Sequence, residues 1–333
     1  MKLEQMPRYP LLCGFTPLQR MENLEQALGC GPLYIKRDDL TPLGLGGNKT
    51  RKLEFLLGDA LAGGADTLVP VGGVQTNHGR LTAAAAAKAG LACTLVLDGA
   101  RPEKLSGNLL LDCLLGASLV YTDRRSTSAV IEETLAALQA AGRAPYFIPE
   151  GGSNAVGSAG YLAMVPELLA QADSLPVPPA RLVCTMGSLG TFAGLWLGAR
   201  AFGAPFSVTG VAVNPTTGYT REKAAALVNE MSAAYGLDIA AAPQDMDIIY
   251  ADAAHDYAGP GYNVPDAKTR GAVELLARTE GIFLDPCYTA KSFRGFCDIA
   301  RELDGGAIFV HTGGTPALWT QEHLDAFAAD YWN

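Results

Sequence analysis

The sequence predicts an α/β protein built on open, mostly parallel β-sheets. Short apolar runs of strand length alternate with longer amphipathic stretches of helical period from residue 49 onward. Glycine-rich turns follow several of the apolar runs, as they do at the ends of strands in α/β folds. Hydrophobic residues make up 49% and charged residues 18% of the 333 residues, a composition that allows a large globular core.

The predicted elements follow this alternation along the chain. The first 45 residues are proline-rich, with a short helix at 21–28 and a strand at 33–38 that runs into a polar turn. From there the regular pattern is typical of a parallel sheet with right-handed crossovers. The predicted helices are 49–62, 77–89, 106–115, 128–141, 157–173, one after Thr191, 221–235, 269–278 and 290–303. The predicted strands are 67–71, 93–97, 118–121, 145–148, 182–185, 207–213, 282–284 and 307–311.

Charge and composition exclude several classes of protein. A net charge of −9 argues against nucleic acid or an anionic membrane as the main partner. No apolar run approaches the roughly 20 residues that span a bilayer, and the first residues hold no signal-peptide core, so we expect a cytoplasmic protein. The seven cysteines are scattered without a Cys-x-x-Cys pair, which indicates reduced thiols, and the four histidines lack metal-ligand spacing, so we expect no metal.

Four strand ends carry glycines together with hydroxyl or amide side chains. They are residues 72–77, 150–154, 187–191 and 312–314. Ligands of open parallel sheets bind outside the carboxyl ends of the strands. One such turn is an ordinary feature of α/β folds, but four of them indicate a small anionic ligand.

The stretch 46–52 holds the candidate nucleophile. Gly46 and Gly47 precede Lys49 at the predicted start of a helix, with two more cations at Arg51 and Lys52. A lysine held there near other cations has its amine pKa lowered and can attack a carbonyl, while the helix start suits an anion. The same residues also fit an ordinary loop with solvated cations.

The turn 187–191 is a candidate phosphate cup. A strand, a Gly/Ser/Thr turn and a helix present backbone N–H groups to an anion. The turn lacks both the P-loop ending and the G-x-G-x-x-G spacing, so a lone monophosphate remains. A plain tight turn fits these residues equally well. The cup consists of Gly187, Ser188, Leu189, Gly190 and Thr191.

Three further positions have both a functional and a structural interpretation. Thr76, Asn77 and His78 open a predicted helix and can hold a carboxylate, or can simply cap that helix. Tyr288, after a predicted strand, is a candidate acid/base or a packing residue. Thr312 can donate to a ring nitrogen or cap a turn. An amine, a monophosphate cup and a carboxylate site together suggest pyridoxal phosphate, with Lys49 as its Schiff-base lysine.

Six collinear runs of this chain resemble the D-cysteine desulfhydrase / 1-aminocyclopropane-1-carboxylate deaminase family. They are residues 35–39, 46–54, 74–80, 151–154, 284–291 and 311–318. The resemblance implies a tryptophan-synthase-β-like fold, type II among pyridoxal phosphate enzymes, with two open mostly parallel sheets in a large and a small domain, and a homodimer. We place the small domain at 50–160 and the large domain at 1–49 plus 161–333.

The resemblance also implies roles for individual residues. Lys49 is the Schiff-base lysine and a proton carrier, and Lys52 helps the 187–191 turn to hold the phosphate. Asn77 lies beside the ring hydroxyl, Thr289 near the pyridine nitrogen with Thr312 close by. For the substrate, the implied residues are Thr76, Asn77 and His78 at the carboxylate, with Thr76 also counted as catalytic, and Tyr262 and Tyr288 nearby.

Departures from the family pattern bear on the substrate. Ring-opening deaminases carry Glu where Thr289 stands and Gln where His78 stands, so this chain looks more like the desulfhydrase branch. Leu189 and Phe192 replace smaller or polar residues and are expected to reshape the pocket, and Asn263 replaces a glycine. D-Cysteine elimination to pyruvate, ammonia and sulfide is the first hypothesis. L-Cysteate elimination to sulfite is the second, with Arg80 and His78 as candidate sulfonate partners; ring-opening deamination and an amino-acid-binding protein without turnover are further alternatives.

Overall fold

Two β-sheets organise the chain in a computed structural model that describes residues 2–214 and 218–332. The smaller sheet has four parallel strands in the order β5-β4-β3-β6. The larger has six in the order β1-β2-β10-β7-β8-β9, all parallel except β1, which pairs antiparallel with β2. The strands are β1 Leu18–Arg20, β2 Leu33–Lys36, β3 Thr67–Gly73, β4 Ala92–Asp98, β5 Ser118–Tyr121, β6 Pro145–Ile148, β7 Pro179–Met186, β8 Ser207–Ala212, β9 Ile248–Ile249 and β10 Gly306–Val310.

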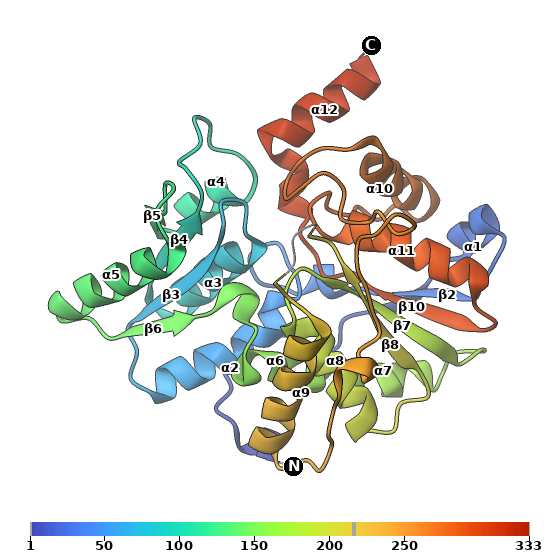
Figure 1. Cartoon of the computed structure of the whole chain (residues 1–333), viewed down its shortest axis with the longest axis horizontal. Coiled ribbons are helices and arrows are strands. Elements are labelled where there is room, and N and C mark those ends of the chain that lie inside the picture. Colours follow the sequence, from blue (N-terminus) through green and yellow to red (C-terminus); the bar gives the residue numbers. More distant parts are fainter. Residues whose placement is uncertain (1, 215–217, 333) are drawn as a thin grey trace.

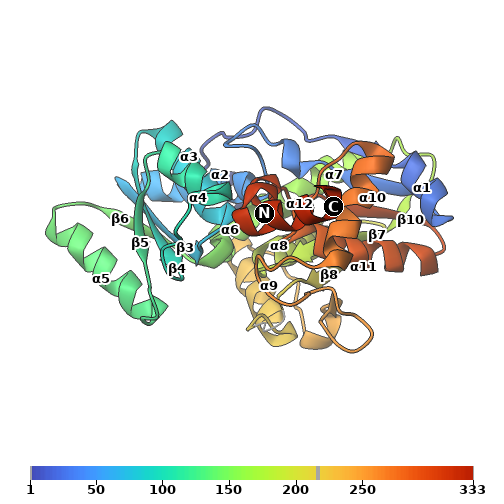
Figure 2. The same cartoon turned by 90° about the horizontal axis from the view of Figure 1, so that it is seen from above.

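The two sheets lie in two lobes side by side (Figures 1 and 2). The small sheet comes from one continuous stretch, whereas the large sheet takes strands from both ends of the chain. The exact bounds that we assign to the two domains stay a prediction. The α-helices are α1 Glu22–Leu28, α2 Lys49–Ala62, α3 Asn77–Ala89, α4 Gly107–Leu114, α5 Thr127–Ala140, α6 Ala155–Leu162, α7 Met164–Ala172, α8 Gly190–Ala201, α9 Arg221–Tyr235, α10 Ala267–Glu280, α11 Thr289–Glu302 and α12 Gln321–Trp332.

Helix α3 shows how the local sequence sets an element next to the site. The Thr76 hydroxyl accepts a hydrogen bond from the Gly79 amide at 3.3 Å, which caps the first turn. The run of alanines at 83–86 is buried where α3 packs against α2 and against β3 and β4 of the small sheet, because small side chains allow close packing. Gly90 ends the helix in the left-handed conformation. The cap therefore fixes residues 76–78 at the carboxyl end of β3.

Several predicted elements differ from the observed ones. The predicted helix 157–173 is two helices, α6 and α7, that meet at Ala163. Pro166 has no N–H to bond the carbonyl four residues earlier, which accounts for the break. The predicted strand 282–284 has no assigned secondary structure and pairs with no strand in the described chain. Ile282 and Leu284 are buried in the core, so their apolar pattern reflects packing and not sheet pairing.

Three expectations from the sequence can be compared with the described part of the chain. All seven cysteines are free thiols. Within residues 2–214 and 218–332, no group of His, Cys, Asp or Glu side chains is arranged to hold a metal ion. No helix in these same ranges has the length and apolar character to cross a membrane.

Candidate active site

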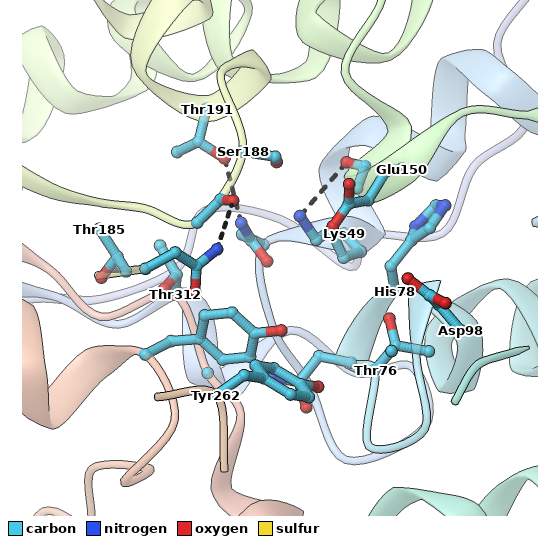
Figure 3. A pocket seen from close by; sticks show the side chains of 18 of the residues that line it. Lys49, Thr76, His78, Asp98, Glu150, Thr185, Ser188, Thr191, Tyr262 and Thr312 are labelled. Atoms are coloured by element: carbon cyan, nitrogen blue, oxygen red, sulfur yellow. Dashed lines mark hydrogen bonds between the residues drawn. The ribbon is translucent and has the colours of Figure 1, made fainter. Parts of the chain in front are cut away.

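A cavity of about 440 Å³ lies where the strand ends of the two sheets meet. The turns after β3, β7 and β10 all line it, and so does the start of α2. Figure 3 shows Thr76, His78 and Asp98 on one side of the cavity and Thr185 and Thr312 on the other, with Lys49 facing the space between. Three of the four glycine-rich strand ends singled out in the sequence thus converge here, and the fourth contributes Glu150 and Gly151.

Lys49 is the first residue of α2, and its position is fixed by the backbone before it. Gly46 has a positive φ of 73°, and a Cβ there would lie 1.9 Å from the Asp39 carbonyl oxygen, so only glycine fits this turn. The Asn48 amide donates to the Thr312 carbonyl at 3.0 Å. The loop before Lys49 is therefore tied to the strand end that carries Thr312.

The Lys49 amine is buried and has a lowered pKa. Its Nζ donates to the Gly151 carbonyl at 3.2 Å. Burial lowers the pKa of Lys49 to about 8, although the nearby Glu150 carboxylate partly opposes the shift. Because the neutral amine is the nucleophilic form, a much larger fraction of Lys49 than of a free lysine is reactive near neutral pH.

The Lys52 amine lies next to Gly190, the first residue of α8. Its Nζ donates to the Gly151 carbonyl at 3.0 Å and to the Ser153 hydroxyl at 3.4 Å. A Cβ on Gly190 would lie 2.7 Å from the Lys52 Nζ and 2.9 Å from the Ser153 Oγ. Burial, together with the charge of Lys49, lowers the pKa of Lys52 well below its ordinary value. An anion at this helix start would offset the cost of burying a charged Lys52, because it would pair with the ammonium.

The predicted cup takes shape around this point. Asn48 Nδ2 donates to Thr191 Oγ1 at 3.0 Å, and Ser153 donates to Ser188 at 2.9 Å. Gly187, Ser188 and Thr191 line the cavity. Leu189 instead packs its side chain into the hydrophobic core, so only its backbone remains available to a ligand.

The start of α3 presents polar atoms that lack partners in the described chain. Both ring nitrogens of His78 are buried without a hydrogen bond, and so is Oδ1 of Asn77. Burial and then the charges of Lys49 and Lys52 lower the pKa of His78 well below its ordinary value, so its ring is neutral. Buried polar groups are normally hydrogen-bonded. These atoms are thus arranged to receive a polar ligand.

Two tyrosines form another wall of the cavity. The rings of Tyr262 and Tyr288 meet edge to face with centroids 5.8 Å apart. Burial raises the pKa of both phenols well above the ordinary range. Both hydroxyls are therefore protonated at neutral pH and can donate a hydrogen bond.

Thr289, which the resemblance places near the pyridine nitrogen, is held by local hydrogen bonds. Its side chain is fully buried, and its hydroxyl donates to Asp285 Oδ1 at 2.7 Å. The same carboxylate accepts from the backbone amides of Cys287, Tyr288 and Thr289. Thr289 thus belongs to the turn that begins α11 and does not line the cavity, whereas Thr312 does.

Other residues reach the cavity without having been singled out from the sequence. They are Asn48, Asp98, Glu150, Thr185 and Asn214. Each lies at or beside the carboxyl end of a strand or in a glycine-rich turn, so the strand-end rule was the available signal. Phe192, expected to reshape the pocket, packs in the core with Leu189 and does not line it.

Comparisons with known proteins decide which cofactor this cavity serves. The family model described as pyridoxal-phosphate dependent enzyme matches residues 10–313. The chain belongs to this family. It is 40% identical over 328 residues to the D-cysteine desulfhydrase of Yersinia enterocolitica, covering 96% of this chain and 97% of the relative. The predicted cofactor, pyridoxal 5′-phosphate, and the expectation of a lyase of fold type II are confirmed.

Two further relatives point to the same family. A Pyrococcus abyssi protein whose name proposes it as a 1-aminocyclopropane-1-carboxylate deaminase is 39% identical over 322 residues, covering 95% of this chain and 94% of its own. The crystal structure of a homologue of that deaminase is similar with a TM-score of 0.88 and 36% identity, covering 98% of this chain and 97% of its own. The predicted resemblance to the desulfhydrase and deaminase family is thereby confirmed, but the two names leave the substrate open.

The residues present fit the cofactor. Pyridoxal phosphate requires an amine, a phosphate cradle and polar partners for its ring. Lys49 supplies an amine of lowered pKa, and Gly190 leaves room at the start of α8 directly above Lys52. The unpartnered Asn77 and the Thr312 hydroxyl lie in the same cavity.

Proposed function

We propose that this enzyme removes the β-substituent of a small amino acid and that D-cysteine is its substrate. In that reaction D-cysteine and water give pyruvate, ammonia and hydrogen sulfide. The desulfhydrase relatives support this class of reaction. The charges of the residues that line the cavity favour a thiol as the leaving group.

The cofactor would be held by residues from both lobes. Lys49 would bind its aldehyde, Lys52 and the 187–191 turn its phosphate, Asn77 its ring hydroxyl and Thr312 its ring nitrogen. We propose Thr312 for the last role because it lines the cavity, whereas the Thr289 hydroxyl is bonded to Asp285. When bound, pyridoxal phosphate supplies an electron sink for the charge left at the substrate Cα.

The protein's own groups divide the remaining work. The N-terminus of α3, with Thr76, Asn77 and His78, would bind the substrate carboxylate, since unpaired N–H groups and partial positive charge gather at a helix start. Lys49 would accept the Cα proton, because its pKa of about 8 suits a base near neutral pH. Tyr288, whose pKa is raised by burial, would stay protonated and serve as a hydrogen-bond donor.

The charges near the substrate favour a thiol over a sulfonate as the leaving group. Arg80 is fully buried and donates to the Gly44 and Gly46 carbonyls, so its guanidinium does not line the cavity. His78 is neutral, while two carboxylates, Asp98 and Glu150, do line it. A sulfonate keeps its negative charge and needs a cation or several N–H donors when desolvated. L-Cysteate is therefore the second candidate.

The alternatives without sulfur chemistry have less support. Opening the cyclopropane ring needs a strong electron sink, and no carboxylate lines the cavity beside Thr185 and Thr312 in the described chain. The nearby Asp285 is bonded to the backbone at the start of α11. A binding protein without turnover would have little use for an amine of lowered pKa at Lys49.

Product analysis of the holoenzyme tests the proposal. Both enantiomers of cysteine and of cysteate and the cyclopropane amino acid are each incubated with the enzyme, and sulfide, sulfite, pyruvate and 2-oxobutyrate are measured. We expect sulfide and pyruvate in equal amounts from D-cysteine, and none from the Lys49→Ala variant. Sulfite would establish the cysteate activity and 2-oxobutyrate the deaminase activity. A visible cofactor band that responds to amino acids without any product would support a binding protein.

We also propose that the enzyme is a cytoplasmic homodimer. The dimer follows from the family resemblance, and the seven free thiols suit a reducing compartment. Light scattering of the holoenzyme and cell fractionation test the two statements.

A further inference from the structure

Lys291 is a buried cation that the proposed chemistry leaves without a role. It lies on α11, three residues after Tyr288, and has no accessible surface. Burying an ammonium without partners costs several kcal/mol, so its partners indicate what the charge is for. The described chain gives Lys291 no ion pair; its Nζ donates to two backbone carbonyls, those of Ala258 at 2.6 Å and Gly261 at 2.8 Å.

Both carbonyls belong to the segment 257–263, which we call the tyrosine loop. The loop lies between β9 and α10 and forms no helix or strand. Within it, Gly261 directly precedes Tyr262, and both line the cavity. The two hydrogen bonds of Lys291 therefore fix the backbone on the N-terminal side of Tyr262. They also keep this irregular backbone from turning its carbonyls to water.

The ring of Tyr262 connects the tyrosine loop with the small lobe by packing. A Cβ placed on Gly73, at the end of β3, would lie 2.9 Å from Tyr262 Cε1, so the ring packs directly against that strand end. On its other side the ring meets Tyr288. Figure 3 shows Tyr262 below Lys49, across the cavity from Ser188 and Thr191. The ring thus closes the cavity where the proposed substrate would lie, and not at the phosphate cup.

A second anchor acts on the C-terminal side of Tyr262. Asn263 has a positive φ of 55°, which a non-glycine residue adopts only at a cost. Its side chain compensates through an amide that donates to Glu322 at 3.2 Å and a carbonyl that accepts from the Cys287 thiol at 3.1 Å. The loop is thereby held on both sides of the tyrosine.

We propose that Lys291 is a positioning residue that sets the substrate-side wall of the cavity by holding the tyrosine loop. The proposal rests on the proposed function for its kinetic test, but its structural test does not need turnover. Lys291→Met keeps the length of the side chain and removes the donors. Lys36→Met is the control for the loss of a buried lysine elsewhere, because Lys36 is also fully buried and donates to the Thr16 carbonyl, but it is paired with Glu167 and lies on β2 away from the loop.

Hydrogen exchange of the holoenzyme gives the structural readout. In Lys291→Met we expect faster amide exchange in residues 257–263, with unchanged exchange at the start of α8 and an unchanged dissociation constant for pyridoxal phosphate. In Lys36→Met we expect a lower melting temperature but no faster exchange in the loop. Equal protection of the loop in wild type and Lys291→Met overturns the proposal, whatever the substrate proves to be.

A double-mutant cycle on kcat/KM gives the functional readout. Lys291→Met should raise the KM for D-cysteine about tenfold with little change in kcat, since it disturbs binding and not the reacting groups. If Lys291 acts through Tyr262, the double variant with Tyr262→Ala should be no worse than Tyr262→Ala alone. Additive losses would overturn the proposal. Absence of turnover in wild type would count against the proposed function only, and the exchange experiment would still decide the role of Lys291.

Discussion

The reactivity of Lys49 arises from the balance of two local effects. Burial favours the neutral amine, and the Glu150 carboxylate favours the charged one. Burial is the larger effect, so the pKa falls to about 8. A lysine in water would be almost fully protonated at the same pH and would react slowly with an aldehyde.

The pH dependence of cofactor capture by the apoprotein should report this pKa. We expect the rate of pyridoxal phosphate binding to rise with pH and to level off above about 8, because the neutral amine reacts. Glu150→Gln should move the inflection to lower pH, since the carboxylate stabilises the ammonium. Stopped-flow absorbance measures both rates. An inflection near the ordinary lysine value in wild type would contradict this prediction.

Thr289 and Thr312 show the limit of motif transfer at the scale of single residues. Both match positions of the family pattern, and the family resemblance implies that Thr289 lies near the ring nitrogen with Thr312 close by. In the structure the Thr289 hydroxyl is taken by Asp285, four residues earlier in the chain. Such a local hydrogen bond is common for threonine near the start of a helix, and the motif does not show whether it forms.

At the scale of the secondary-structure element, the start of helix α8 can attract an anion through two kinds of group, its backbone N–H groups and the Lys52 amine. The backbone N–H groups at its start have no partners within the helix, and the Lys52 amine approaches the same point. One of those N–H groups, that of Gly190, donates to the Ser153 hydroxyl at 3.0 Å. A Cβ at residue 190 would lie within 3.0 Å of the Lys52 amine and of the Ser153 and Ser158 hydroxyls, so these side-chain ends would have to move away from the helix start.

Gly190→Ala should therefore weaken cofactor binding. A methyl group there displaces the Lys52 amine and the two serine hydroxyls, so we expect the dissociation constant of pyridoxal phosphate to rise at least about tenfold, or about 1.4 kcal/mol. Gly271→Ala in α10 is the control, because a Cβ there meets no atom within 4 Å. That control should bind as wild type and be slightly more stable, since alanine favours a helix. Fluorescence titration of the apoprotein measures both constants. Wild-type affinity in Gly190→Ala would argue against the cup.

For the whole molecule, a buried ionic cluster ties α2 to the large sheet. Arg51, two residues after Lys49, donates to Asp38 at 2.8 Å and 2.9 Å and to Glu167 at 2.8 Å and 2.9 Å. Lys36 also contacts Glu167, and the Tyr161 hydroxyl donates to Asp38 at 2.6 Å. The cluster joins the end of β2 to α2, α6 and α7. The helix that presents Lys49 is thereby fixed on a rigid base.

Because of this cluster, we expect the free energy of unfolding to fall at acidic pH. Burial alone would raise the pKa of Asp38, but the Arg51 guanidinium outweighs it and holds that pKa below its ordinary value. A carboxyl with a lowered folded pKa stabilises the protein above its unfolded pKa and loses that contribution as pH falls through the folded pKa. We expect Asp38→Asn to cost about 3 kcal/mol at pH 7 and the gap from wild type to shrink below about pH 4. Urea unfolding measures the gap; a gap that is constant from pH 7 to pH 3 would refute the prediction.

The sequence by itself determined the alternation of strands and helices, the strand-end glycines and the identity of Lys49 as the candidate nucleophile. These features depend on local periodicity, capping and the freedom of glycine, which a linear pattern records. The short strands β1 and β9, of three and two residues, carry too little pattern to predict. Helix α12 was also missed, because it is mostly exposed and so lacks a clear apolar face.

Only the tertiary structure decided which polar groups face the cavity. Arg80 and Thr289 lie in matching motifs, and Phe192 stands where the chain departs from the family pattern. Each of the three nevertheless turns to a partner or to the core and does not line the cavity. Asp98 enters the site from the end of β4, a strand end that the sequence analysis did not single out, whereas Glu150 comes from the predicted 150–154 turn but was not itself named as a site residue. The reason is physical: a polar side chain at a strand end can either face the cavity or bond a nearby backbone carbonyl or carboxylate, and the more favourable contact sets its direction. Those competitors come from distant parts of the chain and meet only in the folded protein.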